Sequence, residues 1–341
     1  MITKIKKINT IVFITVFILL IMHYFSVIEL NLVIKTTVRT ILLLSALFIL
    51  LPDIFQSAQR KIKHTRIRRL WAEAKQLSEE EYENRLKILD KMIKLDPIHQ
   101  FYALRGSTYE LLDKYKEAIA DYSKAIALNP KEYELYEGRA SCYYRLNCFD
   151  KAIADYLRVL QLKPEDEKIM LYLAQNYENN KEYEKAIPYY DKVLEINPNE
   201  IEAYVGQSIC CVQLEKYEET IQICKLGLQL DANEKILYVN IGIAYDAMEM
   251  FDISKNCYEK AIEIDKDYFY TYYCRGISFY DQQLYQEAIN DFNKVIALNG
   301  FLFDSYVWLA KSYRHLGDAD KVRYNINKAK ELKQQKSNET K

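Results

Sequence analysis

The sequence repeats itself every 34 residues from residue 99 onward. At one position of the period an aromatic residue recurs, and three residues earlier a small residue recurs in all seven copies. The first series comprises Tyr109, Tyr143, Tyr177, Cys211, Tyr245, Phe279 and Tyr313. The second comprises Gly106, Ala140, Ala174, Ser208, Gly242, Gly276 and Ala310. A period that runs through seven copies without an insertion limits this part of the chain to an array of similar units, each packed on its neighbours.

Within each unit, large and small side chains recur three and four residues apart, which is the spacing of one face of an α-helix. A second aromatic series begins at Tyr115, and a mostly small series follows three residues later from Ala118. Pro130, Pro164 and Pro198 stand where the second helix of a unit would end, because proline cannot continue a helix. Each unit is therefore predicted to be a pair of short helices. The predicted fold class is all-α, a solenoid of stacked helical hairpins.

This pattern resembles the tetratricopeptide repeat over seven copies, at residues 99–332. A stretch that ends at Pro97 resembles the second helix of an earlier copy, so residues 57–98 are predicted to form a basic linker helix and a half-repeat. The resemblance implies a right-handed superhelix whose first helices line a concave groove, where proteins of this family bind extended or helical peptides. Residues 333–341 are polar and are predicted to form a disordered tail.

Two apolar runs precede the repeats, at residues 11–22 and 41–51. With their flanks, both reach the length of about 20 residues that a helix needs to cross a bilayer. We therefore predict transmembrane helices at about residues 10–28 and 36–55, which together form a membrane-anchoring hairpin within residues 1–56.

A cleaved signal peptide is the alternative for the first run. Lys4, Lys6 and Lys7 provide the basic start that such a peptide requires. The small residues of a cleavage site are missing, however, because His23, Tyr24 and Phe25 are bulky. The sequence therefore favours an uncleaved anchor.

The charges that flank the two runs predict the orientation of the chain. Residues 1–70 carry a net charge of +9, whereas the remainder carries −10. The loop between the two runs contains only Lys35 and Arg39, so the positive-inside rule places both ends of the chain in the cytoplasm. The abundance of Lys, Ile, Asn and Tyr suggests a bacterium, and hence its inner membrane. If the second run did not cross, the repeats would lie on the opposite side.

A basic cluster follows the second run directly. It comprises Arg60, Lys61, Lys63, Arg66, Arg68 and Arg69. One interpretation is that it fixes the topology and attracts anionic lipid headgroups. The other is a specific site for a partner or a nucleic acid. The position next to a span favours the first interpretation, and the acidic body argues against nucleic-acid binding.

The sequence offers no constellation for catalysis, a metal or a cofactor. The seven cysteines are odd in number and form no C-x-x-C pair, which predicts buried, reduced thiols. The four histidines are scattered, and no phosphate-binding glycine loop or nucleophile elbow occurs. Acidic residues such as Glu178, Glu182 and Glu184 are interpreted as solvated surface. We therefore predict neither an enzyme nor a metalloprotein.

The groove residues implied by the resemblance lie beside the core positions of each first helix. Repeats one to three contribute Ser107, Glu110, Glu137, Ser141, Tyr144, Arg145, Tyr172, Gln175 and Asn179. Repeats four to seven contribute Val205, Ile209, Val212, Val239, Asn240, Ile243, Tyr270, Tyr273, Ile277, Tyr280, Lys311 and Arg314. The second set is apolar, and an exposed apolar strip is typical of a partner-binding surface. The alternative, packing between adjacent first helices, applies equally to four of them: Val205, Ile209, Val239 and Ile243.

Three functions are compatible with a repeat array that follows two apolar runs. The leading hypothesis is a membrane-anchored scaffold that binds a protein or peptide in the groove. The second is a periplasmic or lumenal component of a secretion or envelope-biogenesis complex, and the third is a regulatory subunit of a membrane enzyme. Chaperone adaptors of the family hold an acidic tail with lysines and asparagines, but only Lys168 matches that set here. We therefore predict no carboxylate clamp.

Overall fold

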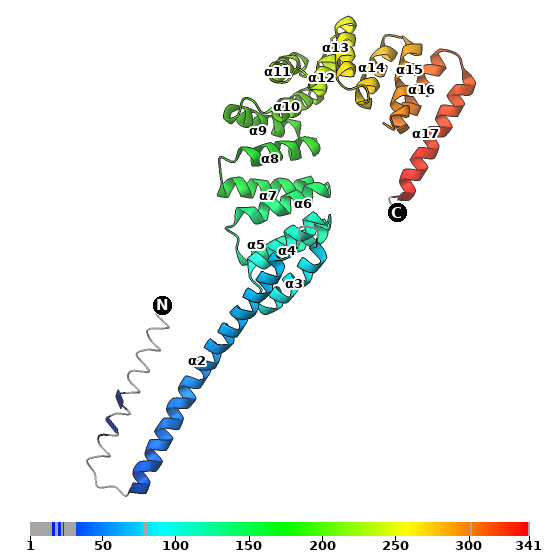
Figure 1. Cartoon of the computed structure of the whole chain (residues 1–341). Helices are drawn as coiled ribbons and strands as arrows, with labels where there is room; N and C mark the ends of the chain where they lie inside the picture. Colours follow the sequence, from blue (N-terminus) through cyan, green and yellow to red (C-terminus); the bar gives the residue numbers. More distant parts are fainter. Residues whose placement is uncertain are drawn as a thin grey trace. The chain divides into compact units, whose positions relative to one another are not determined.

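The computed structural model describes residues 16–17, 20–21, 23, 32–77, 81–300 and 302–339. Most of the first predicted span, and the side chains of most residues between 31 and 50, lie outside this part. The chain divides into two compact units, Met1–Phe101 and Tyr102–Lys341. Figure 1 shows the helices of both units, labelled in chain order.

The first unit contains the helices α2 (Leu32–Lys75) and α3 (Tyr82–Leu95). The predicted boundary at residue 56 is not marked by a helix end, since α2 continues from the second apolar run through the basic cluster. The reason is that the stretch after Pro52 contains no further proline and no glycine, and is rich in good helix formers. No helix in the described residues is both long enough and apolar enough to cross a membrane.

The helix α3, which lies within the predicted half-repeat, packs on α2. Leu86, Leu89 and Met92 are buried on α3, and Leu70 is buried on α2. The Nζ atom of Lys63 lies 2.7 Å from the Oδ1 atom of Asp96, just after the end of α3. The contact between the two helices is therefore an apolar stripe closed by an ion pair.

The repeats form fourteen helices, which Figure 1 shows in order. They are α4 (His99–Leu111), α5 (Tyr115–Leu128), α6 (Tyr133–Arg145), α7 (Phe149–Leu162), α8 (Glu167–Asn179), α9 (Tyr183–Ile196), α10 (Ile201–Gln213), α11 (Tyr217–Leu230), α12 (Lys235–Ala247), α13 (Phe251–Ile264), α14 (Phe269–Asp281), α15 (Tyr285–Ala297), α16 (Leu302–His315) and α17 (Ala319–Glu339). The even-numbered helices are the first helices of the repeats, and the odd-numbered helices are the second. The predicted all-α helical solenoid is confirmed.

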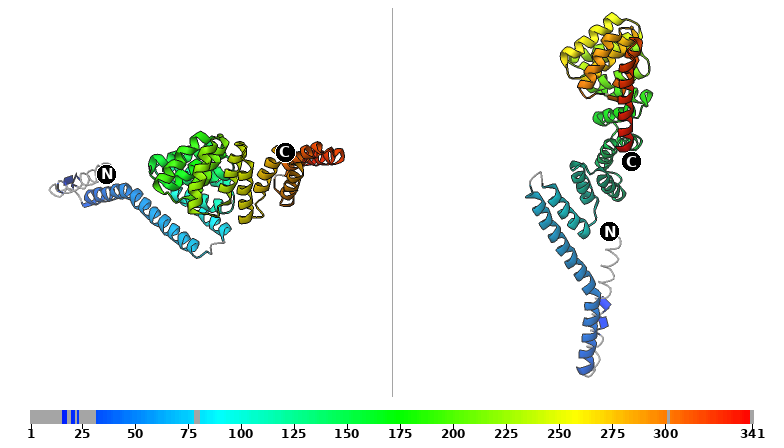
Figure 2. Two further views of the ribbon diagram at one scale, coloured as in Figure 1. Left: turned by 90° about the horizontal axis from the view of Figure 1, so that it is seen from above. Right: turned by 90° about the vertical axis from the view of Figure 1, so that its right-hand side faces the viewer.

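From α6 onward, each first helix packs on its own second helix and on the second helix of the preceding repeat. From α8 to α16, successive first helices also contact one another (Figures 1 and 2). The small residues lie where these elements approach: Ala140, Ala174 and Ser208 are completely buried. A larger side chain at these three positions would therefore have no room.

Every first helix of the array is followed, two residues after its last helical residue, by a residue with a left-handed backbone. These residues follow the 34-residue step: Asp113, Asn147, Lys181, Glu215, Glu249, Gln283 and Gly317. The next N–H then donates to a carbonyl five residues back, as from Cys148 to Tyr143 at 2.9 Å. This Schellman arrangement satisfies the last carbonyls of the helix and turns the chain into the second helix.

Six of these seven positions hold an L-residue in a conformation that favours glycine. We expect Glu249→Gly to stabilise the array by roughly 0.5–1 kcal/mol, and Gly317→Ala to destabilise it by about 1 kcal/mol. Urea unfolding followed by circular dichroism would measure both. If Glu249→Gly destabilised the array and Gly317→Ala stabilised it, the left-handed backbone would not be what constrains these turns.

The C-terminal end differs from the sequence prediction. Residues 333–341 were expected to form a disordered tail, but α17 continues to Glu339. The tail contains no proline or glycine, and its Lys, Gln and Glu residues are good helix formers. The helix that closes the last repeat can therefore extend beyond its packing partner.

Three repeats carry an ion pair between their two helices. Arg105 pairs with Asp121, Arg139 with Asp155, and Arg275 with Asp291. In each pair the guanidinium makes two hydrogen bonds to a buried carboxylate. Such bidentate pairs combine charge with a fixed geometry.

Candidate functional site

Three adjoining cavities lie along the first helices of the array. Cavity one, of about 500 Å³, is lined mainly by α6 and α8; cavity two, of about 340 Å³, by α8, α10 and α12; and cavity three, of about 270 Å³, by α10, α12 and α14. Cavities one and two share Tyr144 and Gln175, and cavities two and three share Ile209 and Ile236. The three cavities therefore form one continuous surface, which we call the groove.

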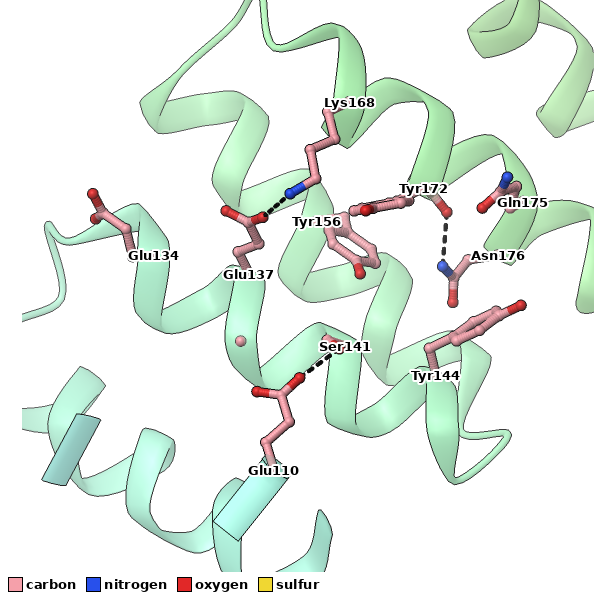
Figure 3. Close-up of a pocket in the computed structure, with 11 residues that line it drawn as sticks. Glu110, Glu134, Glu137, Ser141, Tyr144, Tyr156, Lys168, Tyr172, Gln175 and Asn176 are labelled. Carbon is pink, nitrogen blue, oxygen red and sulfur yellow. Dashed lines mark hydrogen bonds and ion pairs between the residues drawn. The ribbon is translucent and has the colours of Figure 1, made fainter. Parts of the chain in front are cut away.

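Cavity one is polar and rich in carboxylates (Figure 3). Glu110 of α4 accepts a hydrogen bond from the hydroxyl of Ser141 at 2.7 Å. Glu137 of α6 forms an ion pair with Lys168, whose Nζ atom lies 3.1 Å from the Oε1 atom of Glu137. Figure 3 shows the two carboxylates on the same side of the cavity, with the rings of the lining tyrosines opposite. The single matching lysine of a carboxylate clamp is therefore already paired with an internal carboxylate.

Buried tyrosines hold three carboxylates on the first helices. The hydroxyl of Tyr122 donates to Glu110 at 3.0 Å, that of Tyr190 to Glu178 at 2.5 Å, and that of Tyr258 to Asp246 at 2.7 Å. The carboxylates stand 68 residues apart, so they occur in every second repeat. Each tyrosine comes from the second helix and reaches through the repeat to the inner side.

The interpretation of Glu178 as solvated surface was wrong. Glu178 is half-buried, lines cavity two and accepts the Tyr190 hydroxyl. Burial raises the pKa of Glu178, and the hydrogen bond from Tyr190 opposes that rise. A signal for this arrangement is present in the sequence, because a tyrosine follows each of the three carboxylates by twelve residues.

Glycine on the next first helix leaves room for the tyrosine. A Cβ atom at Gly206 would lie 2.2 Å from the Oη atom of Tyr190, and one at Gly138 would lie 2.6 Å from the Cζ atom of Tyr122. By contrast, a Cβ atom at Gly106 would have no neighbour closer than 3.4 Å. Gly138 and Gly206 are therefore required by the passage of the tyrosine rings to the groove.

We expect Gly206→Ala to destabilise the array by about 1–3 kcal/mol, because the methyl group displaces the buried Tyr190 hydroxyl from Glu178. Gly106→Ala is the matched control and should be neutral, or stabilising by up to about 1 kcal/mol through helix propensity. Thermal unfolding of both variants would measure the difference. Equal stabilities of the two variants would contradict the proposed role of Gly206.

Cavity three is apolar. Its described lining consists of aliphatic and aromatic side chains with the two amides Gln213 and Asn240, and it contains no charged group. The apolar members are Ile209, Val212, Ile236, Ile243, Tyr268, Phe269 and Tyr270. The groove therefore changes from acidic to apolar along the array.

The structure brings most of the central sequence-predicted residues to this groove. Tyr144, Tyr172 and Gln175 line cavity one; Val205 and Ile209 line cavity two; Asn240, Ile243 and Tyr270 line cavity three. The lining residues Glu134, Glu202, Glu234, Ile236, Tyr268 and Phe269 were not predicted. These six lie at or near the start of a first helix, away from the middle positions that the pattern singled out.

Two predicted residues are buried. Val239 is completely buried, packed beside Tyr258 and Cys274, so here the alternative of packing was right. Asn240 is 3% exposed and donates to the hydroxyl of Ser208 at 2.8 Å, so it forms part of the cavity floor.

The remaining predicted residues lie outside the three cavities. Arg145 is exposed and donates to the Tyr115 hydroxyl at 3.0 Å. The residues of α14 and α16 pack among themselves: Trp308 donates to the Tyr273 hydroxyl at 3.2 Å, and its ring contacts the ring of Tyr280. Ile277 is half-buried in the same cluster. Between α14 and α16, the protein's own aromatic side chains therefore pack against one another.

Two cationic residues border that aromatic cluster. The Nζ atom of Lys311 lies 3.8 Å from the centroid of a Trp308 ring, which is close enough for a cation–π interaction. Arg314 is exposed on the same helix. Both residues are accessible, but neither lines the groove.

The basic cluster lies along α2. Arg60, Lys61 and Arg68 are exposed, and Lys63 pairs with Asp96. Arg66 and Arg69 line a separate cavity of about 480 Å³, together with Lys91 and Lys94 of α3. The structure thus adds two lysines that the linear cluster did not include.

The cysteines are all free thiols, and five of the seven are buried. Burial raises the pKa of the Cys142 thiol to about 12 and likewise that of Cys211 to about 12. These thiols are therefore protonated and unreactive at neutral pH. In the described residues, no group of three His, Cys, Asp or Glu side chains is arranged to hold a metal ion.

Models of the tetratricopeptide repeat match residues 99–132, 133–166, 168–200 and 237–268. The chain carries tetratricopeptide repeats. The family models thereby confirm the resemblance in four of the seven copies, and such repeats bind protein or peptide partners. A search of curated proteins found no match.

Several solved structures resemble this solenoid. A tetratricopeptide repeat protein from Parabacteroides merdae is 21% identical, with a TM-score of 0.58 over 73% of this chain and 99% of that chain. The Cut9–Hcn1 hetero-tetramer of the APC/C is 15% identical, with a TM-score of 0.51 over 69% of this chain and 49% of that chain. YrrB, described as having an unusual peptide-binding site, is 19% identical, with a TM-score of 0.49 over 55% of this chain and 97% of that chain. The first two structures share their fold with this chain.

Proposed function

We propose that this chain is a membrane-anchored scaffold that binds a segment of a partner protein in its groove. The observation that carries the proposal is the continuity of the three cavities from α4 to α14. A continuous surface that crosses five repeats and the first helix of a sixth suits an elongated chain better than a compact small molecule. Its apolar third cavity provides a place to anchor a side chain, as hot spots of protein interfaces require.

The membrane anchor is supported by the sequence of residues 1–56 and by the basic cluster that follows. At the described end of the second run, beside the exposed Asp53, three apolar side chains are at least half exposed: Leu51, Ile54 and Phe55. Such side chains are favourable in contact with lipid and costly in contact with water. We place the repeats in the cytoplasm of a bacterial inner-membrane protein, in keeping with the positive-inside rule and the free thiols.

A photocrosslinking amino acid at selected sites of the full chain would test the groove. Tyr144 lines cavities one and two, whereas Ala154 and Lys225 are exposed on the second helices α7 and α11. We expect a partner to be crosslinked from position 144 in cells, and not from positions 154 and 225. Crosslinking from the second helices alone would contradict the proposal.

A further inference from the structure

The charge of the groove is strongly one-sided at one end. Cavities one and two are lined by six carboxylates and, among their described residues, a single cation, Lys168. The carboxylates are Glu110, Glu134, Glu137, Glu178, Glu202 and Glu234. A concave surface lined by one sign of charge attracts ligands of the opposite sign and repels those of the same sign.

Lys168 does not offset this charge for an incoming ligand. Its Nζ atom is 3.1 Å from Glu137 and 5.3 Å from the centroid of the Tyr172 ring. Its positive charge is therefore spent on one internal carboxylate, and five others remain along the two cavities. An acidic segment at this place would face these five at close range.

Two of the carboxylates are held in position before any ligand binds. Tyr122 fixes Glu110 and Tyr190 fixes Glu178, and both tyrosines are buried. Because these carboxylates are already held in place, their own side chains lose less conformational entropy when they pair with a cationic ligand. Burial raises the pKa of Glu178, and a bound ammonium or guanidinium group would favour its charged form.

The opposite end of the groove selects a different chemistry. Cavity three joins cavity two at Ile209 and Ile236 and contains no charged lining group among its described residues. A polyamine would match the acidic part but has no apolar group for this cavity. A polypeptide can present both kinds of side chain along one extended strand.

We propose that the partner segment is basic where it crosses cavities one and two, and carries an apolar or aromatic anchor that enters cavity three. This inference rests on the proposed function, because it describes the segment that the groove would bind. The occupant is a segment of another protein, selected by charge complementarity over α4 to α10 and by burial of the anchor between α10 and α14.

A random peptide library displayed on phage and selected on the purified full chain in detergent tests the proposal. We expect the selected peptides to be enriched in Lys and Arg, with a bulky apolar residue on one side of the basic stretch. A labelled copy of a selected peptide would then be titrated with the variants by fluorescence anisotropy. Its affinity should fall as the salt concentration rises, because exposed charge pairs are screened.

The variant Glu137→Gln/Glu202→Gln/Glu234→Gln removes three charges with little change of shape. We expect it to weaken binding of the selected peptide on the order of tenfold. The matched control, Glu184→Gln/Glu218→Gln/Glu263→Gln, removes three exposed charges from second helices and should leave binding unchanged.

Lys168→Ala should strengthen binding by roughly twofold to fivefold, since it frees Glu137. Val212→Thr, which keeps the shape of the side chain, should weaken binding of the apolar anchor.

The outcomes separate this inference from the proposed function. Enrichment of acidic peptides that crosslink to position 144 would overturn the charge inference and leave the groove as a binding site. Peptides that bind equally well to the groove variant and to its control would overturn the inference as well. Failure to select any groove-dependent peptide, together with no crosslink from position 144, would overturn both. Self-association abolished by the groove variant would identify a second copy as the occupant and would also overturn the inference.

Discussion

Replacing Arg139 with alanine is expected to destabilise the repeat array by about 3–5 kcal/mol, the usual cost of leaving one partner of a buried ion pair alone. The Asp155 residue is only 6% exposed. Its two carboxylate oxygens accept from the Nε atom of Arg139 at 2.8 Å and from its Nη2 atom at 2.7 Å. The same guanidinium donates a hydrogen bond to the Ser123 hydroxyl on α5 at 2.9 Å. The alanine variant therefore also loses a hydrogen bond between α5 and α6.

The chain itself supplies the control for this experiment. One repeat further along, Leu173 and Tyr189 occupy the places of Arg139 and Asp155. The double variant Arg139→Leu/Asp155→Tyr should therefore recover most of the stability that Arg139→Ala loses, because it replaces a buried pair by an apolar pair that the fold already accommodates. Urea unfolding of the three proteins would decide. A double variant as unstable as Arg139→Ala would show that the repeats are not interchangeable at this contact.

Deletion of residues 1–56 should move nearly all of the protein from the membrane fraction to the soluble fraction. The deletion removes both predicted spans and leaves the basic cluster, and single charged surfaces bind membranes far more weakly than transmembrane helices do. Carbonate extraction followed by sedimentation would measure the change. The helical signal per residue in circular dichroism should remain, since the repeats lie in a separate compact unit.

Two outcomes would contradict the membrane anchor. A full-length protein that stays soluble without detergent would do so, and so would a truncated protein that remains in the pellet after the carbonate wash.

Replacing residues 1–56 by an unrelated membrane anchor tests the third hypothesis, that the chain is a regulatory subunit of a membrane enzyme. Loss of partner binding with a foreign anchor would indicate that the hairpin itself contacts a membrane enzyme.

The repeat fold could be predicted because its determinants are local and recur. Proline at 130, 164 and 198 and the buried small residues mark the ends and crossings of helices wherever they occur, so seven copies reinforce one interpretation. The left-handed turns were not predicted. Most of them hold residues such as Lys181 or Glu215, which do not favour that conformation by themselves.

The groove could be predicted only in outline, because exposure depends on neighbouring repeats. Val205 and Val239 occupy the same position of the period, yet Val205 lines cavity two and Val239 is completely buried. The difference comes from the larger aromatic residues that surround Val239, among them Tyr258 and Tyr270. Glu178 was misassigned for a related reason: the tyrosine that holds it comes from another helix.

The most direct test of the central claim is a crystal structure of the full chain with a captured partner segment. We expect the segment to lie along the first helices from α4 to α14, with basic side chains near Glu137 and Glu202 and an apolar side chain between Ile209 and Ile243. A segment bound to the second helices would contradict it, as would a groove filled by the protein's own chain.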